Sequence, residues 1–321
     1  MVTFQDILAA RLNVYRHLRP TPLHFYPRLS DLLGAQVYVK HENHQPVGAF
    51  KVRGGVNLAA NLSPAERAAG LATASTGNHG QSIAFAGKVT GARTIVAMPK
   101  NPNPGKAAAI RALGAEVIEH GPDFDTARLW IQEKAQREGM RFVGPTDEYL
   151  IAGVGTYALE IVEDLPDVDA ILVPVGGGSG ACGCCIVAAA VNPAIQVIGC
   201  QASAAPAQYR AWKGERYENA PMQTAAEGVA TRVPFPNTLA VLRERLADFI
   251  LADEDDIWQA VALLLEHTHN LAEGAGALPL AAALKIKERL AGKKVVLVMS
   301  GGNLSLEHLH AALEHSRKPV D

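Results

Sequence analysis

Short apolar segments rich in β-branched residues alternate along the chain with alanine-rich segments of helical periodicity. The apolar segments predict nine strands, at residues 35–42, 70–76, 93–99, 115–121, 141–145, 169–178, 195–202, 249–254 and 293–302. Strands that alternate with helices are typical of parallel sheets whose crossover helices cover both faces. The pattern therefore predicts an α/β fold with open, twisted, mostly parallel sheets.

The same pattern predicts two lobes, because 321 residues exceed the usual size of a single core. Four predicted strands fall within residues 42–145, which is enough for a compact lobe inserted into a larger one. We expect residues 42–145 to form a small inserted domain and residues 1–41 with 146–321 to form a large one. Ser63 and Glu66 have the spacing of a capping box, and the proline-rich stretch 99–106 predicts a loop inside the small lobe.

Charge is mixed along the sequence, with 30 basic and 32 acidic residues and a formal net charge of -2. This leaves no basic stripe for nucleic acid and no polybasic arm for a membrane. No apolar run reaches the roughly 18 residues of a membrane span, and the polar N-terminus lacks the apolar core of a signal peptide. We expect a soluble cytoplasmic protein whose partner is a small molecule.

Three of the four cysteines, Cys182, Cys184 and Cys185, are crowded into one segment. Such a cluster is compatible with a metal or redox site, but a second cluster to complete a metal site is missing. The surrounding residues are small and predict a helix in which cysteine acts as a small hydrophobe. We therefore expect no metal site there.

Three predicted strands run into glycine-bearing turns, at residues 75–80, 176–180 and 300–303. In such folds ligands gather at the carboxyl ends of strands, where backbone N–H groups approach anions. Residues 176–180, "GGGSG", form the strongest phosphate site because successive glycines allow a nest of donors. The turn lacks both the Walker lysine and the dinucleotide spacing, so neither ATP nor a dinucleotide is favoured.

The other two turns offer different groups. Residues 75–80, "STGNHG", supply hydroxyls, an amide and an imidazole, which suit a carboxylate and a ring oxygen. Residues 300–303, "SGGN", supply the neutral hydroxyl of Ser300. Each turn alone is equally compatible with a simple helix start, but three together after buried strands indicate a ligand site.

Lys51 lies in "VGAFKVRGG", directly after Phe50. A lysine beside a hydrophobe usually belongs to the solvated face of a helix. Next to a phosphate site and a carboxylate turn it has a second interpretation, because a desolvated lysine is easily deprotonated and forms a Schiff base with an aldehyde. Pyridoxal phosphate supplies both aldehyde and phosphate, and its amino acid substrate supplies the carboxylate.

Several motifs occur in a fixed order over nearly the whole chain, namely "RPTPL" (19–23), "GAFKVRGG", "STGNHGQS", "GAEV" (114–117), "IAGVGT" (151–156), "GGGSG", "AAEG" (225–228), "AEGAGA" (272–277) and "SGGNLS". With these motifs the sequence resembles the fold-type II pyridoxal-phosphate enzymes, in particular the serine/threonine dehydratases (ammonia-lyases) and the serine racemases. That resemblance implies a homodimer.

The resemblance also implies a role for each matching residue. Lys51 would hold the cofactor and act as acid and base, while Phe50 packs on one face of its ring. Asn78 would bond the ring hydroxyl, and Ser300 would lie at the ring nitrogen. The remaining assignments are phosphate binding by Gly176, Gly177, Gly178, Ser179 and Gly180, substrate carboxylate binding by Ser75, Thr76, Gly77 and His79, and a further wall of Gly228 and Glu273.

The activity implied is β-elimination of a 3-hydroxy amino acid such as L-threonine or L-serine to a 2-oxo acid and ammonia. A serine at the ring nitrogen favours elimination over transamination. Three alternatives stay open: an amino acid racemase in which Thr76 protonates the opposite face, a dehydratase of bulkier substrates such as phenylserine, and a binding module without turnover.

Departures from the family pattern refine these expectations. Val47 and Ala49 replace hydroxyl-bearing residues before Lys51, which predicts a more apolar pocket. Gln201, Ala205 and Ala207 stand where cation-activated members carry oxygen ligands, so we expect no divalent-cation site. The chain ends at "HAALEHSRKPVD", which leaves no room for a regulatory domain.

Overall fold

The computed structural model describes residues 1–215 and 219–315. The last six residues of the C-terminal stretch "HAALEHSRKPVD", on which the expected lack of a regulatory domain rests, lie outside the described residues. Within the described residues, strands form two sheets. The larger sheet has the order β1 (Leu23–Phe25), β2 (Gln36–His41), β10 (Lys294–Met299), β7 (Ala170–Pro174), β8 (Gln196–Ala202) and β9 (Asp248–Ala252). The smaller has the order β5 (Glu116–Glu119), β4 (Thr94–Met98), β3 (Leu71–Ala74) and β6 (Arg141–Phe142).

The predicted α/β architecture is confirmed, and each predicted strand is present. All neighbouring strands are parallel except β1 and β2, where Leu23 lies opposite Lys40 in an antiparallel pair. β1 was not predicted from the sequence. It is a three-residue edge strand that is mostly exposed, so it carries no apolar run to reveal it.

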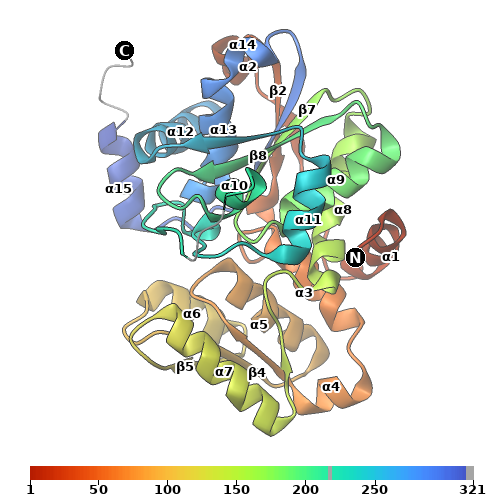
Figure 1. Ribbon diagram of the computed structural model, residues 1–321, viewed down its shortest axis with the longest axis vertical. Helices are drawn as coiled ribbons and strands as arrows, with labels where there is room; N and C mark the ends of the chain where they lie inside the picture. Colours follow the sequence, from red (N-terminus) through yellow and green to blue (C-terminus); the bar gives the residue numbers. More distant parts are fainter. Residues whose placement is uncertain (216–218, 316–321) are drawn as a thin grey trace.

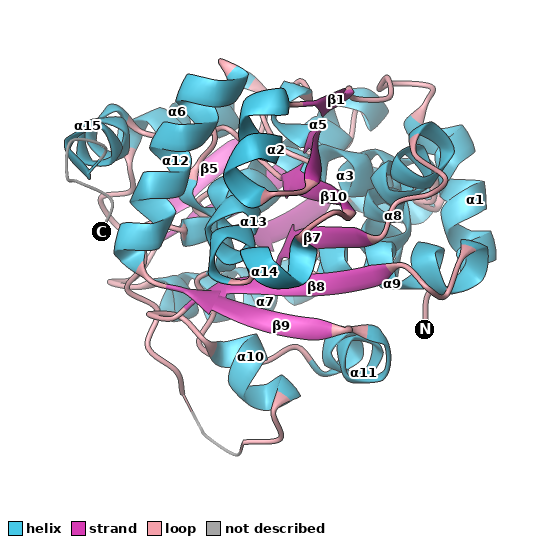
Figure 2. Cartoon of the chain, turned by 90° about the horizontal axis from the view of Figure 1, so that it is seen from above, coloured by secondary structure: helices cyan, strands magenta, loops and turns pink. Residues whose placement is uncertain are grey.

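Helices cover both faces of each sheet, as Figures 1 and 2 show. One face of the larger sheet carries α2 (Pro27–Leu33), α12 (Glu254–Thr268), α13 (Gly274–Lys285), α14 (Lys287–Leu290) and α15 (Leu306–His315). The other carries α1 (Phe4–Val14), α8 (Glu148–Asp164), α9 (Ser179–Val191), α10 (Ala207–Trp212) and α11 (Pro236–Arg245). Among the described residues, no helix combines the length and the apolar character that a membrane crossing needs.

The smaller sheet has α7 (Phe124–Glu138) on one face and α3 (Lys51–Ala60), α5 (Asn78–Thr90) and α6 (Pro104–Ala112) on the other. The remaining elements are α4 (Pro64–Ala69) and the short 3₁₀ helices η1 (Glu42–His44) and η2 (Glu227–Val229). In Figure 1 the smaller sheet and helices α4 to α7 lie below the larger sheet. α3 packs on α5 of the smaller sheet and on α8 of the larger sheet. It therefore connects the helices of the two sheets.

The local signals predicted within residues 42–145 are confirmed. Ser63 Oγ accepts from the backbone N–H of Glu66, and the Glu66 carboxylate accepts from Ser63 N, which completes the capping box at α4. The stretch 99–106 runs through a loop into α6, where the Asn103 side chain caps the first turn. These caps satisfy N–H groups that the helices themselves leave without partners.

Glycines bring α3 and α8 into backbone contact. A Cβ on Gly153 of α8 would lie 2.5 Å from the Arg53 carbonyl oxygen and 2.7 Å from Asn57 Cβ. A Cβ on Gly54 of α3 would lie 2.8 Å from the Leu150 carbonyl oxygen. Since backbone atoms cannot rotate away as side chains do, this contact fixes α3, and with it Lys51, against α8.

We expect Gly153→Ala to lower the free energy of unfolding by about 1–3 kcal/mol, because the added methyl overpacks the α3–α8 contact. Gly144→Ala is the matched control, since a Cβ there would meet no atom within 4 Å, and we expect a change within about 0.5 kcal/mol. Urea unfolding of both variants measures the difference. Equal stability of the two variants would contradict the close contact.

Candidate active site

The three glycine turns follow the carboxyl ends of β3, β7 and β10, and side chains and backbone groups link them. Lys51 contacts the turn after β7, with its Nζ 3.0 Å from Ser179 Oγ. Asn78, from the turn after β3, donates to Glu273 Oε1 at 2.7 Å. The turn after β10 pairs with the segment that precedes Lys51. The turns predicted from the sequence therefore meet around the start of α3.

Lys51 is partly buried as the first residue of α3. Its Nζ lies 5.1 Å from the centre of the Phe50 ring, and that ring packs edge-on against Tyr157. Burial lowers the pKa of the Lys51 amine to about 8, because the charged form loses its hydration. More of the amine is therefore neutral near pH 7 than for an ordinary lysine, which makes it a better nucleophile.

The turn after β10 continues through a short loop before α15 begins at Leu306. Its backbone groups pair with the residues before Lys51. Phe50 N donates to Ser300 O at 3.0 Å, and Gly302 N donates to Gly48 O at 2.9 Å. Gly48 has a φ of 69°, a conformation that favours glycine. This pairing places the buried Ser300 next to the start of α3.

In the turn after β7, little room is left for a side chain at Gly176, Gly178 and Gly180. Gly178 has a φ of 92°, and a Cβ on Gly176 would lie 2.5 Å from the Gly228 carbonyl oxygen. A Cβ on Gly180 would lie 3.4 Å from the Phe50 ring. α9 begins here, and the first N–H groups of a helix have no acceptor within the helix. The turn thus offers backbone donors to an anion, with Lys51 at its rim.

The turn after β3 opens α5 in the same way. Ser75 is buried, and its Oγ accepts from Gly77 N at 3.2 Å. Thr76, Gly77 and Asn78 are partly exposed. The turn therefore offers hydroxyls and free helix N–H groups to a carboxylate.

The His79 side chain lies against the small sheet. Its Nε2 is 3.0 Å from Thr73 Oγ1 and 3.1 Å from Val143 O. Burial, together with the nearby charge of Lys51, lowers the pKa of His79 to about 4, so the ring is neutral. Because Val143 O only accepts, Nε2 carries the proton, and Nδ1 has no hydrogen-bond partner within the described residues. The imidazole thus offers no positive charge to a substrate carboxylate. Of His79, the backbone N–H is therefore the group that can bind a carboxylate.

Asn303 belongs to the site but was not singled out from the sequence. Its side-chain nitrogen donates to Val47 O at 2.9 Å and to Asn78 Oδ1 at 2.8 Å. These bonds orient the Asn78 amide so that its nitrogen faces Glu273. The only sequence signal was its place at the end of "SGGN", where an amide after two glycines could equally close a surface turn.

Glu273 directly precedes the first residue of α13, and its side chain borders Gly228 and Gly301. Burial raises the pKa of Glu273 to about 7, although the hydrogen bond from Asn78 offsets part of the effect. Nearby, an ion pair between Lys106 and Glu227 connects α6 to η2. The predicted wall of the site is therefore linked both to α6 and to the turn before α5, which lie on the smaller sheet.

The crowded cysteines lie on α9, where a helix was predicted, and their thiols are free and buried. Burial raises the pKa of Cys182 and Cys184 to about 12, which makes them poor nucleophiles. Within the described residues, no three His, Cys, Asp or Glu side chains are grouped to hold a metal ion.

The chain belongs to the pyridoxal-phosphate dependent enzymes, because residues 14–301 match that family. It is similar to an L-threonine ammonia-lyase from Thermotoga maritima, with 40% identity over 95% of this chain and 77% of the relative. The processed form of threonine deaminase isoform 2 from Solanum lycopersicum has a TM-score of 0.92 and 31% identity, covering 98% of this chain and 93% of that one. Serine racemase from Dictyostelium discoideum has a TM-score of 0.89 and 33% identity, covering 95% and 99%.

The residues present fit the family's cofactor, pyridoxal phosphate. The phosphate requires a nest of donors, and the turn around Gly178 offers the first backbone N–H groups of α9 beside the Ser179 hydroxyl. The aldehyde requires a deprotonated amine, and Lys51 Nζ lies at the rim of the same turn. Both requirements of one small molecule are therefore met by adjacent groups.

We expect the stability of Glu273→Gln relative to the native protein to rise with pH. The raised pKa means that the folded protein binds this proton more tightly than the unfolded chain. The native carboxyl therefore stabilises the fold at low pH. It loses that contribution as the pH rises from 4.5, the usual pKa of a glutamate, through about 7, the pKa of Glu273 in the folded protein. Urea unfolding of both proteins at about pH 5 and about pH 8 measures the change.

Glu288→Gln, on an exposed surface of α14, is the control for a Glu-to-Gln change outside the candidate site. A constant stability difference between Glu273→Gln and the native protein over this pH range would contradict the raised pKa of Glu273.

Proposed function

We propose that this protein catalyses the dehydration and deamination of a 3-hydroxy amino acid, with L-threonine or L-serine as substrate. The observation that carries the proposal is the partly buried Lys51 amine, 3.0 Å from Ser179 Oγ and between two turns of backbone donors. Similarity to an L-threonine ammonia-lyase and a threonine deaminase supports threonine.

The cofactor would be held by this chain's own groups at four points. Gly176 to Gly180 bind the phosphate through backbone N–H groups, and Phe50 packs on the ring. Asn78 donates to the ring hydroxyl, and Ser300 presents its neutral hydroxyl to the ring nitrogen. When bound, pyridoxal phosphate supplies an aldehyde that captures amines and a ring that withdraws electrons from the substrate α-carbon.

The substrate is held by the opposite turn. Ser75, Thr76 and Gly77, with the backbone N–H of His79, bind its carboxylate at the start of α5. Gly228 and Glu273 line the wall on the far side. This arrangement directs the α-carbon toward Lys51, so the carboxylate contact serves as the orienting contact.

Lys51 moves the proton that starts the reaction. Its Nζ takes the proton from the substrate α-carbon, and its pKa of about 8 suits an amine that must gain and release a proton near neutral pH. The Cα–H and Cβ–OH bonds break, and water leaves with that proton. The resulting enamine is hydrolysed to a 2-oxo acid and ammonia, which balances the reaction.

Racemisation is a second candidate, favoured by one observation. The partly exposed Thr76 lies in the carboxylate turn, on the opposite side of the candidate substrate position from Lys51 in our proposal. A hydroxyl there returns a proton to the opposite face of the α-carbon. Similarity to a serine racemase supports it.

We also propose the predicted domain division, with residues 42–145 as the inserted domain. The smaller sheet, which spans residues 71–142, supports it. A homodimer in the cytoplasm is proposed on the family resemblance and the mixed charge of the sequence.

We expect Lys51→Ala to abolish both the visible absorbance of the bound cofactor and turnover, with a loss of at least about a thousandfold. Lys88→Ala, an exposed lysine of α5, should leave both unchanged. Absorbance spectra and 2-oxo acid release report the result. A coloured, active Lys51→Ala protein would end the mechanism.

We expect 2-oxo acid to form from L-3-hydroxy amino acids faster than their chirality is lost. A panel of L- and D-substrates, with oxo acid and enantiomer ratio followed together, ranks the substrates. Loss of chirality with little oxo acid would instead identify a racemase. Thr76→Ala should spare elimination and lower racemisation, and an equal loss of both would remove its assigned role.

A further inference from the structure

Four ionisable side chains form a buried cluster that the mechanism above does not use. Lys40, Glu42 and Arg53 have no exposed surface, and Glu160 is 3% exposed. Two positive and two negative charges leave the cluster neutral. Moving ions out of water costs free energy that their pairing only partly offsets. We therefore look for a role of the cluster other than stabilising the fold.

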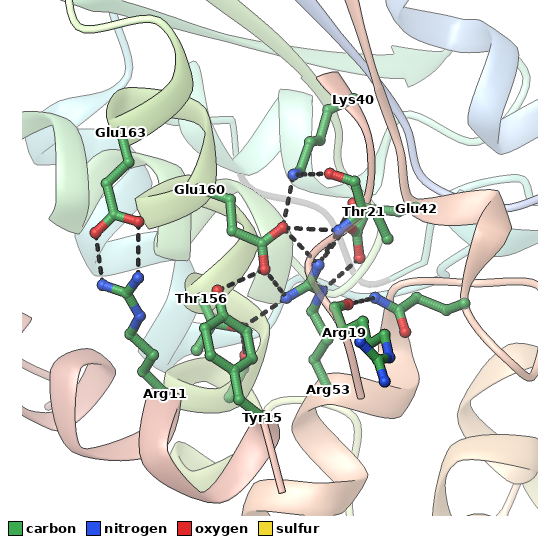
Figure 3. Close-up of polar contacts among 12 residues, drawn as sticks. Arg11, Tyr15, Arg19, Thr21, Lys40, Glu42, Arg53, Thr156, Glu160 and Glu163 are labelled. Atoms are coloured by element: carbon green, nitrogen blue, oxygen red, sulfur yellow. Dashed lines mark hydrogen bonds and ion pairs between the residues drawn. The ribbon is translucent and has the colours of Figure 1, made fainter. Parts of the chain in front are cut away.

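Arg53 is at the centre of the cluster, with both carboxylates around its guanidinium (Figure 3). Its Nε and Nη2 donate to the two oxygens of Glu42 at 2.7 and 2.8 Å. Its Nη1 and Nη2 donate to the two oxygens of Glu160 at 2.6 and 2.9 Å. Two carboxylates thus hold one planar group in two forks, which fixes its orientation as well as its position.

The remaining donors complete the cluster. Lys40 Nζ donates to Glu160 Oε2 and to Thr21 O, both at 2.6 Å. Tyr15 OH donates to Glu160 Oε1 at 2.7 Å, and Thr21 N donates to Glu160 Oε2 at 3.1 Å. Every charge therefore has several partners, and Glu160 is held from α1, β2 and α3 at once.

Arg53 follows Lys51 by two residues, in the first turn of α3. That turn is weak by itself, because Phe50 provides no side-chain cap and Gly54 and Gly55 lower helix propensity. From the small lobe, Ser82 Oγ donates to Lys51 O at 2.6 Å. The Arg53 hydrogen bonds to Glu42 and Glu160 connect the same turn to η1 and α8, which pack with the larger sheet.

We propose that Arg53 is a positioning residue for Lys51. Its guanidinium, clamped between Glu42 and Glu160, fixes the start of α3 to the larger sheet and holds the Lys51 amine beside Ser179. The proposal rests on the proposed function only in taking Lys51 as the lysine that binds the cofactor.

Loss of the clamp has a measurable consequence at Lys51. A looser first turn admits water to the amine, and hydration favours its charged form. His79 of α5 is the titratable group that faces the Lys51 amine, and its ring is neutral. The Arg53 cluster has no net charge, so neither group shifts the pKa of Lys51 by its charge. The pH at which Lys51 loses its proton therefore reports its burial.

The test compares Arg53→Lys with Arg11→Lys. Arg11 makes a bidentate pair with Glu163 at 2.5 and 2.9 Å, also onto α8, but these side chains are 35% and 47% exposed and this pair does not involve α3. Both changes keep the charge and remove the fork. For each cofactor-free full-length protein, the rate of visible band formation with added pyridoxal phosphate is measured against pH, and thermal unfolding is recorded.

We expect Arg53→Lys to move the midpoint of the pH profile up by about one unit, so that the reaction is about tenfold slower near neutral pH and converges with the native rate at high pH. Arg11→Lys should keep the native midpoint. A lower melting temperature for Arg53→Lys with an unchanged midpoint would overturn the proposal, because the cluster would then only stabilise the fold.

If Arg53→Lys shows no cooperative unfolding, the same profile is measured for the double variant Glu42→Gln with Arg53→Gln, which keeps the cluster neutral. A raised midpoint supports the proposal and a native one overturns it. The readout is independent of turnover, so failure to release 2-oxo acid from any 3-hydroxy amino acid would sink the proposed function and leave this inference standing.

Discussion

The desolvation of the Lys51 amine is the constraint on which the rest of the site depends. An exposed lysine is protonated at neutral pH and cannot attack an aldehyde. Lys51 has its pKa lowered to about 8 because Phe50 and the turn after β7 exclude water. Burial works only while the amine has a polar partner, and Ser179 provides one without adding a charge.

Neutral groups dominate the remainder of the site for the same reason. The turns at the starts of α5 and α9 offer backbone N–H groups and hydroxyls, and Ser300 carries a further hydroxyl. His79 is kept neutral by burial and by Lys51. Backbone donors hold anions at fixed positions without a side chain that must be ordered on binding.

The layers of the two sheets meet at this site, and α3 contacts helices of both. Gly54 and Gly153 bring α3 against α8, while Ser82 bonds it to α5. Asn303 connects the segment before Lys51 to Asn78, and Asn78 reaches Glu273. The lysine, the carboxylate turn and the start of α13 are thus joined by short hydrogen bonds, so displacement of one is transmitted to the others.

The sequence by itself determined the alternation of strands and helices, the turns at strand ends and the lysine among them, because these depend on local periodicity and on glycine. It did not show the exposed edge strand β1, the direction of the His79 ring or the place of Asn303. Arg53 was visible only as a charge in "KVRGG". Tertiary structure alone decided that it is buried, because its partners Glu42 and Glu160 come from segments whose approach no local pattern encodes.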